Sequence, residues 1–304
     1  MVFATLYLGK MCLKCILKNY KGTVMRYILM ILLCSFSFAV SAKTVKMEAS
    51  KVALGQWHLG LGVGVGIAKN PLHGGDDFPL LLLPDIAYYD EHLYFDNGQL
   101  GYTFFDQQNH VVSLIAEFNP EKKFFVFWSP SNIFLKNTNS VTNKTKPVIE
   151  NPEANSIDYN EIAKRKWALD SGINYQYFHE RFIARVNVLT DISNIHNGWR
   201  VGVEFAHSFN IGNLIVQPIV GVWHKTAELN NYYYGLSKRD NVGIIYKLDS
   251  VWQPYAHLQL TYPLSQNKAV LLKLSYDDYS DTSNSPLFKY DYAVNIFMGL
   301  KYIF

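Results

Sequence analysis

The chain has 304 residues and carries 28 lysines and arginines against 25 aspartates and glutamates, a formal net charge of +3. Five of the basic residues and none of the acidic ones lie within residues 1–42, so the remaining 23 basic and 25 acidic residues give a net charge of −2. This balance provides no basic surface for a phosphate backbone, and we expect no nucleic-acid partner.

The stretch from Met25 to Ala42 has the form of a secretory signal peptide. Arg26 supplies the charge, residues 28–40 are nearly all apolar, and small residues precede the expected cleavage after Ala42. The apolar run is too short to cross a membrane as a helix. We therefore predict that residues 1–42 are an N-terminal extension plus signal peptide, with translation starting at Met25. All three cysteines lie in this part, so the mature chain has no disulfide.

Residues 43–56 are predicted to form a short periplasmic segment, and residues 57–304 a β-barrel of the outer membrane. The first strand, 57–68, has large apolar residues at its odd positions and mostly glycines at its even positions. Strict alternation places the two sets on opposite faces of one strand. The run Gly60-Leu-Gly62-Val-Gly64 lacks the G-x-G-x-x-G spacing of a dinucleotide-binding loop, and no helical pattern follows it, so we predict no nucleotide cofactor.

Eleven further segments alternate in the same way, and together they predict an antiparallel barrel of about twelve strands. The segment 124–135 is interrupted by Pro130, and a barrel of ten strands is the alternative. The predicted strands are 57–68, 79–89, 94–105, 110–118, 124–135, 166–177, 182–191, 199–209, 214–225, 251–262, 268–276 and 290–304.

Charged and amide side chains recur on the strand face opposite the apolar one. A soluble core would reverse this pattern, whereas a membrane barrel turns its apolar face to lipid and its polar face to the lumen. We predict that five charged residues line the lumen: Asp170, Arg185, Arg200, Glu204 and Lys273.

The connections alternate in length, which fits a barrel with short periplasmic turns and longer outer loops. The two longest predicted loops are 136–165 and 226–250. The tight connections are expected at Asp90–His92, Asn119–Lys123, Phe178–Arg181, Asn210–Asn213 and Pro263–Asn267. Aromatic residues near strand ends, such as Tyr88, Tyr89 and Tyr232–Tyr234, are expected to form interfacial girdles.

The final strand ends on an aromatic residue. Its even positions from Tyr292 onward are all apolar, while the odd ones include Asp291, Asn295 and Lys301. We predict that its last outward residues act as the barrel-assembly signal: Leu300, Tyr302 and Phe304.

No catalytic, metal or cofactor residues are predicted. His207 and Ser208 are neighbours on a strand and so point to opposite faces. His196 lies in a predicted loop, and nothing in the sequence brings His224 and His257 together. Asp277, Asp278 and Asp281 are better explained as a solvated acidic loop than as a cation site.

Several phrases, in their order and spacing, resemble the MipA/OmpV family of outer-membrane proteins. The most specific is Asn231-Tyr-Tyr-Tyr-Gly235, and the residues Gly74–Asp77 depart from the family pattern. The phrases are Pro71–Pro79, Leu83–Tyr88, Leu229–Ser237, Ser283–Leu287 and Gly299–Phe304.

The resemblance implies a barrel in the Gram-negative outer membrane, in contact with its lipid. It also implies a non-enzymatic scaffold, with a murein lytic transglycosylase and a peptidoglycan synthase as partners. Two alternatives stay open: a narrow channel for small solutes, and a surface adhesin that acts through the long loops.

Overall fold

The computed structural model describes residues 54–126 and 156–304. The predicted signal peptide and most of the predicted segment 43–56 lie outside the described residues, as does most of the long loop 136–165. The strands are β1 (Gln56–Ala68), β2 (Phe78–Pro79), β3 (Leu82–Tyr89), β4 (Leu93–Asp96), β5 (Gln99–Gln107), β6 (His110–Phe118), β7 (Leu169–His179), β8 (Phe182–Asp191), β9 (Trp199–His207), β10 (Phe209–Ile211), β11 (Leu214–Lys225), β12 (Val251–Pro263), β13 (Lys268–Asp278) and β14 (Tyr292–Ile303). The helices are the 3₁₀ segments η2 (Pro120–Phe125), η4 (Tyr159–Glu161) and η5 (Lys238–Asp240), and α3 (Ala227–Tyr233).

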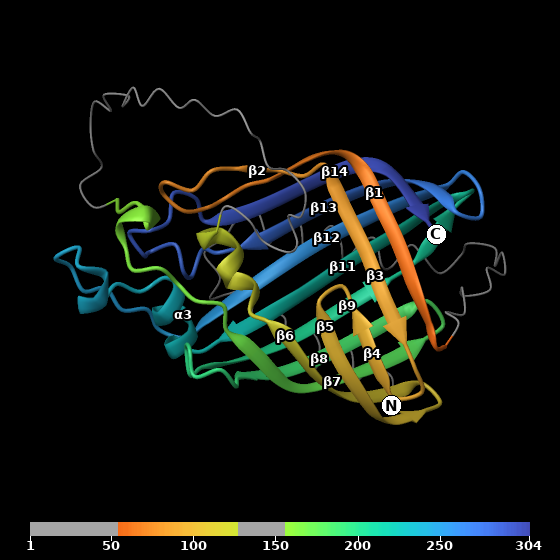
Figure 1. Ribbon diagram of the computed structural model, residues 1–304, viewed down its shortest axis with the longest axis horizontal. Coiled ribbons are helices and arrows are strands. Elements are labelled where there is room, and N and C mark those ends of the chain that lie inside the picture. Colours follow the sequence, from red (N-terminus) through yellow and green to blue (C-terminus); the bar gives the residue numbers. More distant parts are fainter. Residues whose placement is uncertain (1–53, 127–155) are drawn as a thin grey trace, which may run out of the picture. The chain divides into compact units, whose positions relative to one another are not determined.

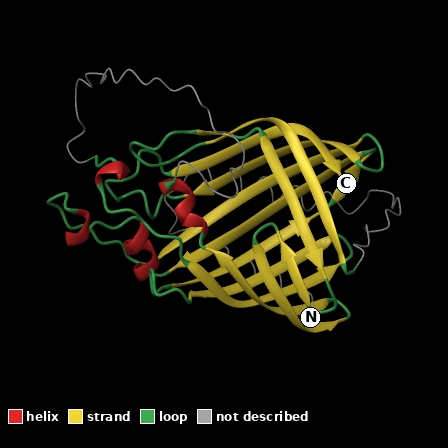
Figure 2. Ribbon diagram, in the orientation of Figure 1, coloured by secondary structure: helices red, strands yellow, loops and turns green. Residues whose placement is uncertain are grey.

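Twelve strands close into one antiparallel barrel (Figures 1 and 2). Around the ring they follow the order β1, β3, β4, β5, β6, β7, β8, β9, β11, β12, β13 and β14, and β14 pairs with β1 to close it. The short strands β2 and β10 add to β1 and β11 at the rims. The predicted barrel is confirmed.

The outward face of the wall is apolar. Val65 on β1 is 69% exposed and Met298 on β14 is 56% exposed, and Ile173, Phe205 and Trp252 are exposed on other strands. An apolar outer surface with polar residues within is stable in lipid and unfavourable in water. Among the described residues no helix is long and apolar enough to cross a membrane.

The count of twelve strands is right, but two of its members are wrong. Predicted strand 94–105 is two strands, β4 and β5, joined at Asn97 and Gly98, which both have positive φ. Asn-Gly is a strong hairpin signal because both residues tolerate this conformation. Predicted strand 124–135 begins instead inside η2, and residues 127–135 lie outside the described part of the chain.

The two rims differ as predicted, with one correction. Tight turns follow β3, β5, β7, β10 and β12, at the end where β1 starts and β14 finishes; we call it the tight-turn end. The strands joined by the long connections 69–81, 119–168, 226–250 and 279–291 end and begin again at the other end, the long-connection end. Asn119–Lys123 was expected to be a tight turn but begins the longest of these connections.

The strands β1 and β14 approach closely where glycines face each other. Gly64 pairs with Gly299, and a Cβ on Gly64 would lie 2.1 Å from the carbonyl oxygen of Met298. At Gly64 the crowding comes from the neighbouring backbone, so the seam of the barrel itself requires glycine.

Candidate functional site

The long connections pack together into a buried apolar cluster, which we call the loop core. Four connections contribute to it, and Tyr233, Tyr234, Leu229 and Leu287 within it are fully buried. Its members are Leu72, Phe124, Ile157, Ile162, Leu229, Tyr233, Tyr234, Leu236, Leu248, Tyr279, Leu287, Phe288 and Ala293. A cluster of this kind gives the loops a defined structure of their own rather than leaving them as solvated tethers.

The segment η2 crosses the mouth of the barrel. It follows β6 directly, yet Lys123 reaches Asp277 of β13, with 4.0 Å between Nζ and Oδ2. The strands β6 and β13 are six places apart in a ring of twelve, so they stand on opposite sides of the barrel. Asn70, after β1, also donates a hydrogen bond to the carbonyl oxygen of Phe124 at 3.0 Å. The described wall is therefore bridged from side to side at this end, and η2 is visible inside it in Figure 2.

Glu121 ties η2 to the wall and to the loop core. Its carboxylate forms a buried ion pair with Lys225 of β11, and it accepts a hydrogen bond from the hydroxyl of Tyr234. Burial alone raises the pKa of Glu121, but Lys225 and Tyr234 outweigh it and hold the pKa below its ordinary value. Glu121 is therefore ionised and bound at neutral pH.

A second buried ion pair holds the connection 226–250. Arg165 Nη1 lies 2.6 Å from Asp240 Oδ1, and both side chains are wholly buried. The same guanidinium donates to the carbonyl oxygens of Tyr233 and Gly235, at the end of α3. Burial raises the pKa of Asp240, but the hydrogen bond and charge of Arg165 outweigh burial and lower it.

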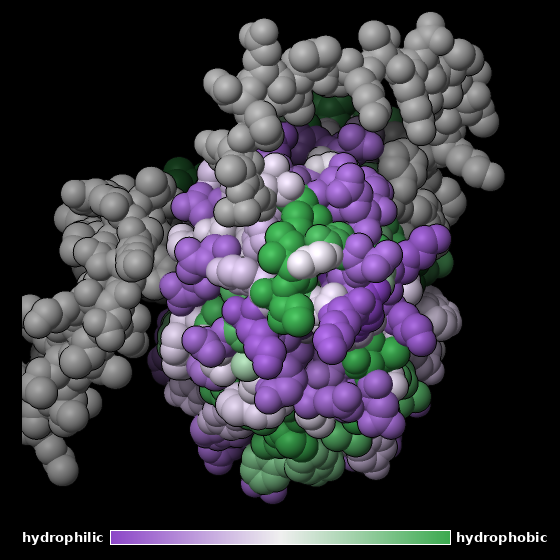
Figure 3. Space-filling model, turned by 90° about the vertical axis from the view of Figure 1, so that its left-hand side faces the viewer, coloured by the Kyte–Doolittle hydropathy of each residue, from purple (hydrophilic) through white to green (hydrophobic). Residues whose placement is uncertain are grey.

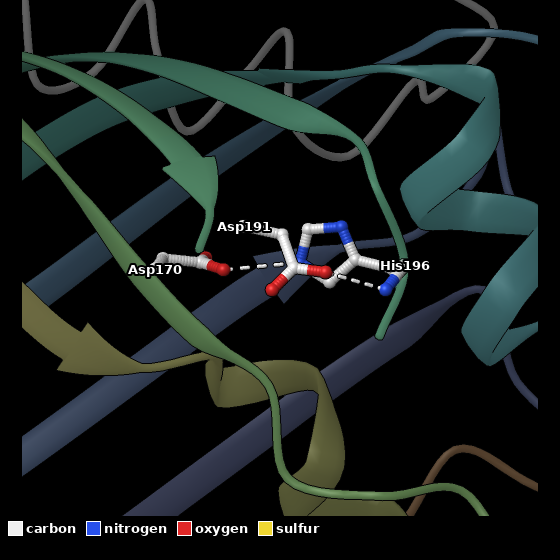
Figure 4. A group of neighbouring side chains, drawn as sticks. All are labelled: Asp170, Asp191 and His196. Carbon is white, nitrogen blue, oxygen red and sulfur yellow. Dashed lines mark hydrogen bonds and ion pairs between the residues drawn. The ribbon is translucent and has the colours of Figure 1, made fainter. Parts of the chain in front are cut away.

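Asp170 accepts hydrogen bonds in a third network, on the inner wall, and its contact with His196 is drawn in Figure 4. It accepts hydrogen bonds from Asn119 at 2.8 Å, Arg200 Nε at 2.8 Å and His196 Nε2 at 3.0 Å. Arg200 also pairs with Glu117 at 2.6 Å. The Nδ1 atom of His196 accepts from the N–H of Gly198, so the ring proton is on Nε2 and points at Asp170.

Asp170, Asp191 and His196 are close enough together to be considered as metal ligands. Their donor atoms are already engaged: both nitrogens of His196 are used, and Asp191 accepts from the N–H groups of Ser193, Ile195, His196 and Asn197. The guanidinium of Arg200 also adjoins Asp170 and would repel a cation. The group therefore stabilises the loop after β8 and does not fit a metal.

The pairing register places all five predicted lumen residues on the face opposite the exposed apolar one. Arg200 adjoins Asp170, as described above. Arg185 Nη1 lies 2.5 Å from Glu204 Oε1, whose other oxygen accepts from the hydroxyl of Tyr255 at 2.8 Å. Lys273 stands apart: among the described residues it has no ion pair within 4.0 Å and no hydrogen bond.

A cavity of about 400 Å³ lies on the side of the interior where Lys273 is found. The strands β12, β13 and β14 and the start of the connection 69–81 form its walls, and η2 contributes Lys123 and Phe124. Asp76 and Asp77 line the cavity where it meets solvent, because both are exposed. The interior is thus partly filled by ion-pair networks and partly hollow.

Several residues of this site were not predicted. Four charged or amide residues are buried at the mouth: Asn119, Glu121, Arg165 and Lys225. The sequence predicts a tight turn for the first two, a loop for Arg165 and the end of a strand for Lys225. Their sequence carries no signal of a shared site, because the partners that tie them to other elements are 43 to 158 residues away along the chain.

Of the histidines and acidic residues weighed for chemistry, His257 and Asp277 meet, but His224 does not join them. His224 packs against Trp252, with ring centroids 4.7 Å apart, on the outer face. His257 faces inward and lies 3.4 Å from Asp277, although its strand is next to that of His224. Asp278 accepts from the N–H of Ser280, away from both.

The expected aromatic girdle is wrong for several of its members. Tyr89 faces the interior and donates to Asp96 at 3.0 Å, while Tyr233 and Tyr234 are buried in the loop core. The Asn-Tyr-Tyr-Tyr-Gly phrase therefore fills a packed core and does not lie at the membrane surface.

The outer surface of the long-connection end is mainly hydrophilic, with one hydrophobic patch near the middle of the view (Figure 3). Within the connection 226–250, the exposed large apolar residues are Ile244 and Ile245.

Comparisons with known proteins agree with the barrel. The family described as "MltA-interacting protein MipA" matches residues 61–304. The MltA-interacting protein of Escherichia coli K12 is 24% identical over 259 residues, which cover 83% of this chain and 93% of that protein. The putative outer membrane protein YiaT of the same strain is 22% identical over 81% of this chain and 91% of its own length.

Two more distant similarities are found. OmpV of Vibrio cholerae is 24% identical over 137 residues, 44% of this chain and 52% of that protein. The solved structure of a loop-deletion mutant of Vibrio cholerae OmpT covers 82% of this chain and 98% of its own. Its sequence identity of 10% and TM-score of 0.33 are too low to bear on function.

Proposed function

The chain belongs to the MltA-interacting protein MipA family and is an outer-membrane β-barrel, and from this we propose that it is a non-enzymatic scaffold. Its partners on this proposal are a murein lytic transglycosylase and a peptidoglycan synthase, which it would hold at the outer membrane. The name of the Escherichia coli relative, MltA-interacting protein, supports a partner of the first kind.

The observation that most favours binding over transport is the crossing of the barrel mouth by η2. Its Lys123 reaches the far wall, and Glu121 ties it to both β11 and the loop core. An open channel needs a continuous passage, whereas a scaffold needs only a stable platform. A bridged mouth therefore favours a protein that acts through its surfaces.

The tight-turn end is the expected periplasmic side. The start of β1 and the end of β14 both lie there. Its turns are short, such as Gly212–Asn213 between β10 and β11, and they offer little docking surface. The segment 43–56 therefore remains our candidate docking site. Most of it lies outside the described residues, and at its end Leu54 is 63% exposed.

The scaffold is tested by immobilising the refolded mature barrel, passing solubilised cell envelope over it and identifying retained proteins by mass spectrometry. We expect a murein hydrolase or synthase to be retained, and to be lost when residues 43–56 are deleted. A matched control carries Ile244→Ser and Ile245→Ser at the opposite end and should retain the same proteins. If the intact barrel retains neither class of enzyme, the scaffold proposal is wrong.

A narrow channel is the second candidate, because the interior keeps a cavity of about 400 Å³ beneath η2. The predicted lumen residues Arg185, Glu204 and Lys273 would then face the permeating solute. Discrete conductance steps in planar bilayers would favour this candidate over the scaffold.

A further inference from the structure

On the described strands, the cations that face the barrel interior have carboxylate partners, with Lys273 as the exception. Arg185, Arg200, Lys225 and Lys301 each have a carboxylate partner in direct contact. Lys273 has none within 4.0 Å among the described residues, and its nearest charged neighbours act only at longer range. Lys273 is itself exposed and lines the interior cavity, so its ammonium group is available to an anionic group from outside the chain.

Lys273 projects from β13 into the interior cavity, where the other wall groups are suited to a polar solute. Asn295 and Ser275 line the cavity and hydrogen-bond to each other at 2.7 Å. His257 and Gln259 of β12 lie along the same wall. These groups offer hydrogen bonds but no opposing carboxylate next to Lys273.

The entrance of the cavity has the opposite charge. Asp76 and Asp77 line it and are exposed, and Asp77 accepts a hydrogen bond from the N–H of Asn70 at 3.1 Å. Lys69, the cation on the same side, lies over the ring of Tyr290 at 5.5 Å. A simple anion would be repelled by these carboxylates, and a simple cation by Lys273 and Lys123 within.

A small solute that carries both a negative and a positive charge can pair with Lys273 inside the cavity and with the carboxylates at its entrance. We propose that the interior cavity binds a zwitterion of the amino-acid or short-peptide class, with its carboxylate on Lys273 and its ammonium group towards Asp76 and Asp77. The volume of about 400 Å³ lies in the range of pockets that enclose small organic ligands. This site is separate from the proposed docking of murein enzymes, and either can fail without the other.

The test uses the refolded mature barrel and isothermal titration calorimetry with three peptides of equal length. Triglycine carries both charges, N-acetyl-triglycine only the negative one and triglycine amide only the positive one. We expect saturable binding of triglycine at one site per barrel, and binding at least about tenfold weaker for each blocked peptide, since each loses one charge-assisted contact.

Two lysine variants locate the site. Lys273→Met should weaken triglycine binding at least about tenfold and leave the affinity for triglycine amide unchanged. Lys268→Met, on the same strand but at the tight-turn end, is the matched control and should bind triglycine as the unaltered barrel does. Heat-modifiable migration on gels confirms that each variant is folded. Equal affinities for the three peptides, no binding of triglycine, or binding that Lys273→Met leaves unchanged would each overturn the proposal.

Discussion

At the scale of single residues, the interior depends on buried charges whose partners come from distant parts of the chain. Asp170 receives donors from Asn119, His196 and Arg200, which belong to three different segments. Removing one member of such a group is costly, because it leaves its partners buried without compensation. These residues therefore act as clamps between the wall and the connections.

We predict that Asp170→Ala lowers the free energy of unfolding by about 3 kcal/mol, because it leaves Arg200 with only Glu117 and His196 without its acceptor. Urea unfolding in detergent micelles measures the change. Glu228→Ala, which removes an exposed carboxylate from α3, is the control and should have an effect below about 0.5 kcal/mol. Similar values for the two variants would contradict the clamp.

The loop core should loosen in acid. Glu121 and Asp240 have pKa values below their ordinary values of 4.5 and 3.8, so their ion pairs contribute fully above those values and are lost as the pH falls through the lowered pKa values. Hydrogen exchange in residues 226–250, corrected for the intrinsic pH dependence, should accelerate below that range. Glu121→Gln should show fast exchange already at neutral pH. Protection that is independent of pH in the unaltered chain would argue against this.

At the scale of elements, the local sequence predicted a strand correctly where one face of the segment meets lipid and the other meets the interior. The prediction failed where a segment is not part of the barrel wall. Phe124 and Phe125 lie in a stretch that reads as a strand, yet they belong to a helix that crosses the mouth. The hairpin at Asn97 and Gly98 shows the reverse case, since its signal was present in the sequence but was read as the middle of a strand.

The seam between β1 and β14 should be sensitive to a single methyl group. Gly64→Ala places a Cβ 2.1 Å from the carbonyl oxygen of Met298, so the strands must separate, and we expect a loss of about 1–3 kcal/mol in stability. The midpoint of urea unfolding measures it. Gly98→Ala is unsuitable as a control, because Gly98 has a positive φ that alanine adopts poorly. The control is Ala293→Gly on β14, which removes a methyl group from one strand of the same pair and so measures the loss of side-chain packing alone. A stable Gly64→Ala barrel would show that the seam can adjust.

At the scale of the whole molecule, the described part of the chain is a barrel whose long-connection end is filled. The loop core joins four connections, and Glu121 and Lys225 fasten it to the wall. The bridged mouth favours the proposed binding of partners over an open pore. The role of Leu300, Tyr302 and Phe304 in barrel assembly stays a prediction; all three are exposed on the outer face of β14 or just beyond it.

We predict that the unaltered barrel shows no discrete conductance steps in planar bilayers. Replacing residues 229–246 with a short glycine-serine linker removes Tyr233 and Tyr234 from the loop core and Asp240 from its ion pair with Arg165, and should produce measurable steps. The control replaces only residues 242–245, which include the exposed Ile244 and Ile245, and should remain closed. Large steps in the unaltered barrel would contradict a filled mouth.

The sequence by itself determined the class of the protein and which face of most strands meets lipid. The number of strands agrees because one missed strand, at β4 and β5, offsets the wrongly predicted strand 124–135. The class and the faces follow from the sequence because the alternation of apolar and polar residues is a property of each strand by itself. In a membrane barrel the apolar set faces the lipid and the polar set faces the interior. Only the tertiary structure decided what the connections do. The pairs Glu121–Lys225 and Arg165–Asp240 join residues 104 and 75 positions apart. No local pattern records such contacts, because they exist only after the barrel has closed and brought its rims together.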